Sequence, residues 1–247
     1  MPFDLASLDA PFAALTGYDW GADAAPLKAI DDAVVAAHGD PALGADLEKR
    51  FAAVLGAGAS RAAKEYACRK LMMIGTAASV PSLAALLGDA DNSHMARFAL
   101  ERIPAAEAAQ ALRDALSTVP ASLQIGMIES LGGRGDAASV PALARLLTGD
   151  AKLATAAATA LGHIHTPEAL AALSSADPLA AAGVGRAVVD ARLVAAEALL
   201  ASGKRAEARN VYQTLAEAVE GKPGAKRVAL AAARGLLSCL DTQTAAS

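Results

Sequence analysis

The chain has 247 residues, of which 54% are hydrophobic but only 3% are aromatic. Its formal net charge of −4 gives no electrostatic reason to bind nucleic acid or an anionic membrane surface. No apolar run is long and uncharged enough to span a bilayer. Alanine dominates the composition, and because it is the best helix former we expect an all-α protein with closely packed helices.

Residues 1–57 are expected to be an N-terminal segment that ends in a helical cap. Ala24–His38 and Leu43–Leu55 both place apolar residues at the three-to-four spacing of an amphipathic helix. The first of these helices is expected to bury one side: Leu27, Ile30, Val34 and Val35. Because this pair lacks the turn signature of the repeats that follow, it is predicted to shield the first repeat from solvent.

The only tryptophan of the chain lies before this cap, in the stretch Tyr18-Asp19-Trp20-Gly21. Tyr18 and Trp20 either pack beneath the cap or are exposed and anchor a partner. Burial is the expected outcome, because the chain has so few other aromatic side chains.

Residues 58–177 contain an internal repeat of helix pairs. The first helices end at Ile74, Ile103, Leu131 and Leu161, which are 29, 28 and 30 residues apart. Leucines stand at equivalent positions of the second helices: Leu83, Leu112, Leu143 and Leu170. A fixed period of this kind is typical of repeat proteins in which each repeat packs on its neighbours. The sequence therefore predicts a right-handed α-solenoid of stacked antiparallel helix pairs.

The pattern changes after Asp177-Pro178, and residues 178–247 are expected to form a C-terminal helical segment. Val184–Ser202 is predicted to be one long helix, and two further helices are expected to end at Val219 and Leu240. The chain is thus predicted to consist of three segments, 1–57, 58–177 and 178–247.

Two copies of the repeat carry a more specific pattern. Residues 75–89 and 132–150 each contain a glycine followed by V-P-x-L-x-x-L-L, and 166–173 carries the degenerate copy T-P-E-A-L-x-x-L. This pattern resembles bacterial HEAT repeats of the short, phycobilisome-lyase-like type, over about residues 58–177. The resemblance implies an armadillo-like helical solenoid.

The same resemblance implies a polar ladder between repeats. HEAT repeats of this type often carry an aspartate followed six residues later by an arginine, as Asp91 and Arg97 are. Asp150 is instead followed by Ala156, so the implied ladder is incomplete.

The C-terminal segment resembles a single tetratricopeptide repeat. The residues that carry the resemblance are Ala196, Leu199, Gly203, Ala208, Tyr212 and Leu215. Arg192 stands where that family has an aromatic residue, so this copy is degenerate. The resemblance implies a helix pair that caps the predicted solenoid.

The sequence leaves two alternatives for the compartment in which the protein works. The first residues, MPFDLASLDAPF, lack the basic and apolar regions of a signal peptide, so the chain as given is expected to be cytoplasmic. The stretch from Tyr18 to Gly21, together with 30–35, 68–69 and 93–97, is similar to uncharacterised bacterial HEAT proteins. Some of those are joined to secreted sugar-hydrolase-like domains, which implies an accessory module and an exported setting if the chain is a fragment.

His163 and His165 are the strongest candidates for metal ligands. Two imidazoles in a turn can bind zinc with a carboxylate, and Glu168 is the nearest. No fourth ligand lies at a useful spacing, so we expect no metal and no cofactor. HEAT-like hydroxylases that bind two irons use His-Glu pairs, and the chain has no His-Glu dipeptide. It is therefore not expected to be an enzyme.

Two other patterns receive a structural interpretation. Gly132-Gly133-Arg134-Gly135 lacks the Lys-Ser/Thr of a phosphate-binding loop, and these glycines are expected to end a helix. Cys68 and Cys239 do not suggest a disulfide framework, and Cys68 is expected to be a small, semi-buried apolar residue.

The second helices of the repeats are expected to line a concave face. The residues about half a turn from their buried leucines are small and nearly neutral: Ser82, Ala85, Asp114, Arg145 and Ala172. Such a row is neither a basic stripe nor an aromatic platform, which argues against nucleic-acid binding. We expect these residues to bind a partner, with Asp114 and Arg145 fixing its register.

The sequence thus favours a protein-interaction or scaffold module that presents a curved helical surface to a peptide or protein. The alternative is a structural accessory domain of a larger bacterial enzyme, such as one with a sugar-hydrolase-like domain. Neither reading involves nucleic acid or a membrane.

Overall fold

All regular structure in the computed structural model is helical within the residues that it describes, 4–56, 58–180 and 183–240. The all-α prediction is therefore confirmed for this part of the chain. The chain divides into two compact units, Met1–Ser130 and Leu131–Ser247, and the boundary falls inside α8 (Ala121–Gly133). This division does not follow the expected boundaries at residues 57 and 177, and the three-segment organisation remains a prediction.

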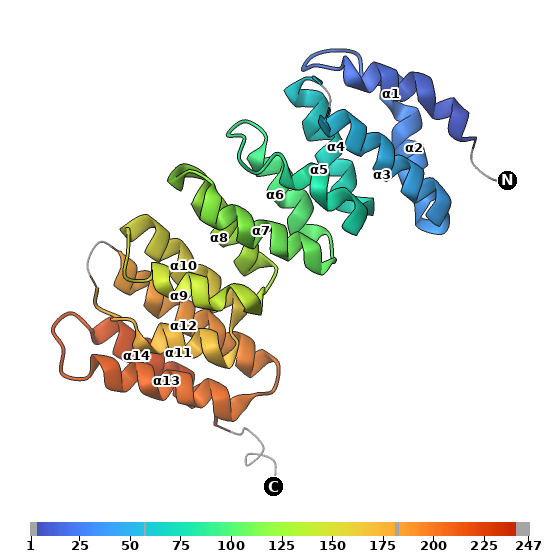
Figure 1. The fold of residues 1–247 in the computed structure, drawn as a ribbon. Coiled ribbons are helices and arrows are strands. Elements are labelled where there is room, and N and C mark those ends of the chain that lie inside the picture. The colour runs from blue at the N-terminus through green and yellow to red at the C-terminus, as the bar shows by residue number, and fades with distance from the viewer. Residues whose placement is uncertain (1–3, 57, 181–182, 241–247) are drawn as a thin grey trace, which may run out of the picture. The chain divides into compact units, whose positions relative to one another are not determined.

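The N-terminal unit is a succession of helices joined by short turns. Its α-helices before α8 are α1 (Asp9–Thr16), α2 (Lys28–Ala36), α3 (Pro41–Gly56), α4 (Arg61–Ile74), α5 (Val80–Ala84), α6 (Ser93–Arg102) and α7 (Ala106–Thr118). Short 3-10 helices are η1 (Leu5–Leu8), η2 (Ala25–Leu27), η3 (Ala37–Gly39) and η4 (Ala77–Ser79). Helix α4 packs against both α3 and α6, and α5 packs against α7 (Figure 1). The first helix of one pair thus packs on the first helix of the next pair, and the second helix packs on the next second helix.

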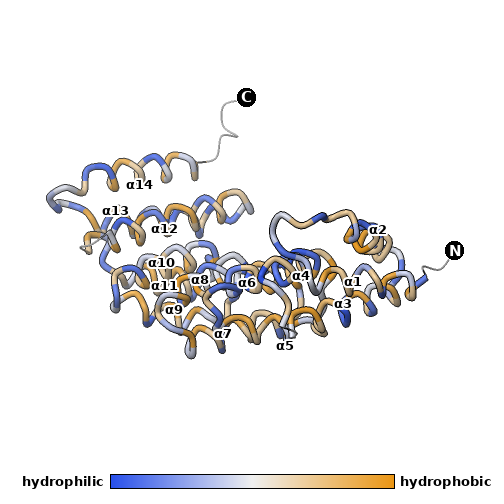
Figure 2. The backbone as a smooth tube through the Cα atoms, turned by 90° about the horizontal axis from the view of Figure 1, so that it is seen from above, coloured by the Kyte–Doolittle hydropathy of each residue, from blue (hydrophilic) through white to orange (hydrophobic). Residues whose placement is uncertain are grey.

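The C-terminal unit repeats this arrangement. After the end of α8 it contains η5 (Ala137–Ser139), α9 (Val140–Leu146), α10 (Ala151–Ile164), α11 (Pro167–Ser175), α12 (Val184–Ala201), α13 (Arg205–Val219) and α14 (Lys226–Ser238). Helix α9 packs on α11 and α10 on α12, while α12, α13 and α14 pack in series. Hydrophobic and hydrophilic residues alternate along these last helices (Figure 2), as expected where each helix buries one side.

The repeated sequence Ala-Ala-Ser-Val-Pro forms the same local structure in both units. At 77–81 and at 137–141, the first three residues form a 3-10 helix and the valine begins an α-helix. The proline lies in the first turn of that helix, where an N–H group would have no helical partner anyway. The sequence repeat therefore corresponds to a structural repeat.

The glycines near the ends of the first helices do more than end them. Gly132 lies within α8 and Gly162 within α10, so neither stops its helix. A Cβ on Gly132 would lie 2.7 Å from Ala160 Cα, and one on Gly162 would lie 2.8 Å from Ala191 Cα. The Gly-rich stretch does end the helix as expected, since α8 stops at Gly133 and Gly135 has a positive φ of 64°. Gly132 in addition lets neighbouring helices come into backbone contact.

Val35 corrects the expected core. It was assigned to the buried side of its helix, but it is 70% exposed. In α2, the small residue Ala33 is buried with Ile30 and Val34. Val35 lies about 100° further round the helix and so faces solvent. Cys68, which was expected to be semi-buried, is only 1% exposed in α4 and so is buried more deeply than expected.

Candidate functional site

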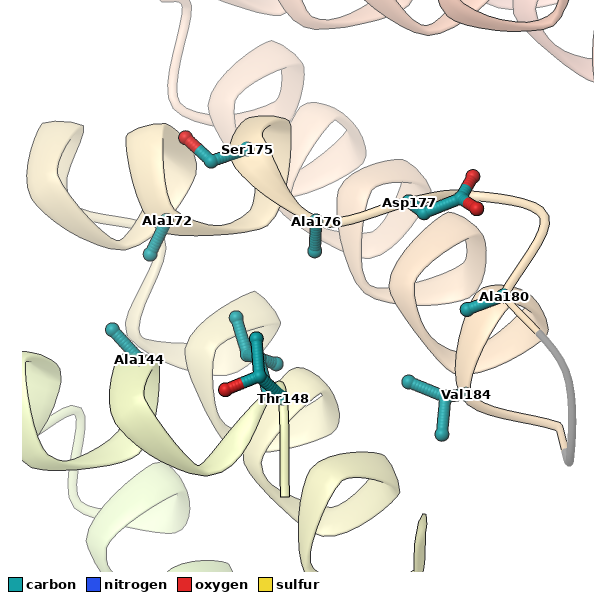
Figure 3. Close-up of a pocket in the computed structure, with 9 residues that line it drawn as sticks. Ala144, Thr148, Ala172, Ser175, Ala176, Asp177, Ala180 and Val184 are labelled. Carbon is teal, nitrogen blue, oxygen red and sulfur yellow. The ribbon is translucent and has the colours of Figure 1, made fainter. Parts of the chain in front are cut away.

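A pocket of about 560 Å³ lies within the C-terminal unit and is the candidate functional site. Its walls come from the end of α9, from α11, from the segment 176–180 and from the first residue of α12. Figure 3 shows its lining residues. A pocket of this volume falls in the range of ligand-binding clefts and is large enough for apolar side chains.

Methyl groups form the interior of this pocket. The side chains of Ala144, Ala172, Ala176, Ala180 and Val184 point into the shared space (Figure 3). Each wall contributes mainly small residues, which leave room without creating a polar surface. The pocket is therefore suited to the burial of an apolar group.

Of the polar side chains that line the pocket, the Thr148 hydroxyl donates to the Arg145 carbonyl at 3.4 Å, and those of Ser175 and Asp177 lie at the rim. The hydroxyl of Ser175 donates to the carbonyl of Ala171 at 3.0 Å, and the Asp177 carboxylate accepts from the Leu179 N–H at 2.9 Å. Both side chains point away from the methyl groups (Figure 3). Asp177 thus gives the rim a negative charge, whereas the interior stays apolar.

The predicted partner-binding residues lie in both units. In the C-terminal unit, Ala172 lines the pocket, whereas Arg145 is exposed on α9 next to the lining residue Ala144. In the N-terminal unit, Ser82 is partly buried, Ala85 is exposed, and exposed Asp114 accepts a hydrogen bond from Gln110 on the same helix at 2.7 Å. Partner binding by these residues remains a prediction.

The sequence did not point to Ala144, Ala176 and Ala180. The predicted row lay half a turn from each buried leucine, but Ala144 follows Leu143 directly and so lies about 100° from it. Ala172 and Ala176 are four residues apart and therefore share one face. A search for alanines at this spacing would have found part of the pocket.

The two candidate histidine ligands do not converge. His163 is exposed on α10, and His165 ends that helix with a left-handed backbone, at φ 38°. The Nδ1 atom of His165 lies 2.6 Å from the carbonyl oxygen of His163, and Glu168 is exposed in the first turn of α11. Within the described ranges, no group of three or more His, Cys, Asp or Glu side chains could hold a metal ion. That the protein needs no metal or cofactor stays a prediction.

Trp20 is not buried. Its side chain is 72% exposed, while Tyr18 is partly buried and its carbonyl oxygen accepts a hydrogen bond from the Ser60 hydroxyl. The backbone N–H of Trp20 donates to the Asp19 carboxylate at 2.8 Å, within an exposed turn. The expected burial of Trp20 was wrong, because the contact to α4 is made by the Tyr18 backbone and not by the indole.

Arg97 makes hydrogen bonds between helices that differ from those of the implied ladder. Its Nη1 donates to the Gly126 carbonyl at 2.8 Å and to the Ser130 hydroxyl at 3.0 Å, so it links α6 to α8. The side chain fits because Gly126 has no Cβ, which would lie 2.4 Å from Arg97 Cζ. Asp91 supplies none of these contacts.

Asp31 joins α2 to α4 in the N-terminal unit. It accepts hydrogen bonds from Tyr66 Oη at 2.5 Å and from Lys70 Nζ at 2.6 Å. Burial acts to raise the pKa of Asp31, but the bonds from Lys70 and Tyr66 outweigh it and hold the pKa below its usual value. Burial, and then the bond to Asp31, raise the pKa of Tyr66. These three side chains have a structural role, because the Asp31 carboxylate on α2 accepts hydrogen bonds from both Tyr66 and Lys70 on α4.

No protein-family model matches the chain, and a comparison with curated proteins finds no similar sequence. Two solved structures are similar to it in part. A crystal structure of an engineered protein is 21% identical, with a TM-score of 0.42, over 78% of this chain and 96% of that chain. Human deoxyhypusine hydroxylase, in complex with glycerol, is 17% identical, with a TM-score of 0.38, over 95% of this chain and 96% of that chain.

At these scores the likeness carries no argument about function. The structure itself supports a helical fold in which helices pack against their neighbours in a repeating way. None of the described helices is long and apolar enough to cross a membrane.

Proposed function

We propose that the chain is a right-handed α-solenoid scaffold that binds a peptide or protein partner. The observation that carries this proposal is the methyl-lined pocket between α9, α11 and α12. An apolar side chain of the partner would be buried there. The rim charge of Asp177 would then favour a basic residue beside that anchor.

The HEAT-like part of the proposal is supported by the repeated packing. Helix α9 packs on α11 as α5 packs on α7, and the same Ala-Ala-Ser-Val-Pro turn begins both α5 and α9. In a solenoid each repeat buries its apolar side against the next one. These contacts are those that stacked helix pairs need.

The tetratricopeptide-like part is supported by burial. Apolar positions that carried the resemblance are buried together in one cluster: Ala196, Leu199, Ala208 and Tyr212. Gly203 has a positive φ of 80°, which a side chain rarely adopts, at the turn between α12 and α13. The Tyr212 ring lies so close to Gly235 that a Cβ there would be 2.2 Å from it, so α14 packs tightly on α13.

Such a scaffold works by being formed before its partner arrives. The pocket walls are helices and short turns, so little ordering is needed when the partner binds. The interior presents methyl groups and no acid–base pair, which favours binding over catalysis. We therefore propose a non-enzymatic role, in whichever compartment the partner occupies.

Filling the pocket tests this function. Partners are first captured with the wild-type protein, and the affinity of each is then measured by calorimetry for two variants. Ala172→Phe places a ring in the pocket and should weaken binding at least tenfold, since a lost anchor costs about 2 kcal/mol. Ala171→Phe is the matched control, because Ala171 is the exposed neighbour on the same helix.

The control variant should bind as wild type does. Equal affinity for wild type, Ala172→Phe and Ala171→Phe would contradict the proposal and direct attention to Trp20 or to Arg145. Failure to capture any partner would favour the alternative, a structural accessory domain within a larger enzyme.

A further inference from the structure

Arg192 is the one arginine among the fully buried side chains of the described core. It lies on α12, and only 1% of its surface is exposed. Its Nη2 atom donates to the Thr214 hydroxyl on α13 at 2.8 Å. The Nε and Nη1 atoms are buried and have no hydrogen-bond partner among the described residues. The guanidinium therefore has a neutral hydroxyl as its described partner.

No acidic side chain of α12 compensates this charge. Asp190 and Glu197 are both exposed, so they lie on the opposite side of the helix from Arg192. Asp190 also pairs with Arg186 at 3.6 Å. Burial lowers the pKa of Arg192, and no nearby carboxylate offsets that effect.

A buried, unpaired guanidinium opposes folding, because its charge loses hydration without gaining a counter-ion. An arginine stays charged in proteins, so it cannot escape this cost by losing its proton. An apolar or aromatic residue would fill the same position at no such cost. The position is therefore adapted to something other than stability alone.

We propose that Arg192 is the receptor for a carboxylate ligand in the C-terminal unit. The unpaired Nε and Nη1 groups supply the donors that a carboxylate accepts, and Thr214 holds the third nitrogen in place. Since Nε and Nη1 are closed to solvent, binding requires α12 and α13 to part beside Thr214, which is only partly buried. This site is separate from the apolar pocket and does not depend on the function proposed for it.

The single positive charge selects a carboxylate over a phosphate. A carboxylate carries one negative charge, which the guanidinium neutralises. A phosphate monoester carries close to two at neutral pH, so its binding would leave an uncompensated negative charge in the core. The described partner of the guanidinium is a neutral hydroxyl, which cannot compensate that excess charge.

The side-chain Nε–H resonance of Arg192 gives a direct test. The full chain is prepared with isotope-labelled arginine, and the Arg192 signal is identified by its loss in Arg192→Met. Sodium acetate should shift this signal in a saturable way, whereas sodium chloride at equal ionic strength should not. The exposed residue Arg186 is the internal control, and its signal should not saturate with either salt.

Thermal unfolding provides a second measurement. Acetate should raise the Tm of the wild type above its value in chloride, and the Arg192→Met variant should show no such difference. Thr214→Val keeps the charge but removes its described partner, and it should weaken the acetate response without abolishing it. An Arg192 signal that shifts no more than that of Arg186, or an equal acetate effect in Arg192→Met, would overturn the proposal.

Two further titrations identify the source of the carboxylate and test the selectivity. A blocked Gly-Glu-Gly peptide represents the side chain of a protein partner, and acetate represents a free small carboxylate. Saturation by both supports a partner side chain, and saturation by acetate alone supports a small metabolite. Saturation by inorganic phosphate but by neither carboxylate would contradict the assignment.

Discussion

The two units hold their helices together by different kinds of contact. In the N-terminal unit, charged and hydroxyl side chains reach from one helix to the next. In the C-terminal unit, glycine and alanine bring helix backbones into direct contact. The comparison shows that a similar stacking of helix pairs can depend either on matched polar atoms or on the absence of side-chain atoms.

Glu48 illustrates the polar kind of contact. This buried residue of α3 accepts from the Thr76 N–H at 2.6 Å, from the Thr76 hydroxyl at 2.9 Å and from the Ser79 hydroxyl. It thereby fixes the turn between α4 and α5. Arg97 has the same role between α6 and α8. Hydrogen bonds made by side chains tolerate small shifts in helix position, because a side chain can adjust its rotamer.

Gly162 illustrates the other kind. Its missing Cβ lets α10 lie against the backbone of Ala191 on α12. Backbone atoms cannot adjust as a side chain can, so this contact has no tolerance for added volume. The C-terminal unit should therefore be more sensitive to the size of a residue, and the N-terminal unit to its polarity.

The largest effect is expected from Gly162→Ala. The added Cβ would lie 2.8 Å from Ala191 Cα, and overpacking of this kind costs about 3 kcal/mol. Chemical denaturation measures the free energy of unfolding. Gly44→Ala is the matched control, because Gly44 also lies in a helix but has open space around it. That variant should be stabilised by up to about 1 kcal/mol through helix propensity. If Gly162→Ala left the free energy of unfolding unchanged, α10 and α12 would have to lie further apart than in the structure.

Glu48→Ala should have the next largest effect, at about 2 kcal/mol. The change leaves the buried Ser79 hydroxyl without its described acceptor and also removes the acceptor of the Thr76 N–H. Lys49→Ala, at the exposed neighbouring position, should change the free energy of unfolding by no more than about 0.5 kcal/mol. Equal effects of the two changes would contradict a structural role for the Glu48 carboxylate.

Arg192→Met is expected to have a smaller effect of the opposite sign. It removes a buried, unpaired charge and keeps a flexible apolar side chain, so it should stabilise the chain by about 1 kcal/mol in chloride buffer. A rise in the Tm measures this gain. Destabilisation by a similar amount would mean that the guanidinium is paired or hydrated in solution.

The smallest effect concerns the pH dependence of the N-terminal unit. The pKa of Asp31 is lower in the folded state than its ordinary value of 3.8. Its contribution to stability is therefore present above about pH 4 and is lost as the pH falls through the folded value. Asp31→Asn should reduce the loss of stability in this acidic range. An unchanged acid-unfolding curve would show that Lys70 and Tyr66 do not stabilise the ionised carboxylate.

The sequence predicted the helices and their repetition because both depend on patterns that recur. Apolar spacing located α10 and α12, and the two copies of Ala-Ala-Ser-Val-Pro located the turns before α5 and α9. It did not predict contacts that depend on a single pair of residues. The place of Gly162 against Ala191 is a matter of distance between helices, which no spacing along the chain reveals.

The candidate sites were harder to predict for a related reason. The resemblance to a tetratricopeptide repeat placed Arg192 at an aromatic position, but an arginine is usually exposed, so its burial could not be foreseen. The pocket depends on alanines, which are too common in this chain to be distinctive. Trp20 was misplaced because scarcity of aromatic residues says nothing about which of them is buried.

Because Cys68 is buried, the rate at which its thiol is labelled measures how fast the N-terminal unit opens. Burial, and then the charge of Glu65, raise the pKa of this thiol to about 12, so a thiol reagent reaches it only when the N-terminal unit opens. Cys239, in the C-terminal unit, is partly exposed and should react much sooner. The native chain therefore reports the opening rate of its N-terminal unit through the slower of two labelling phases, without any engineered probe.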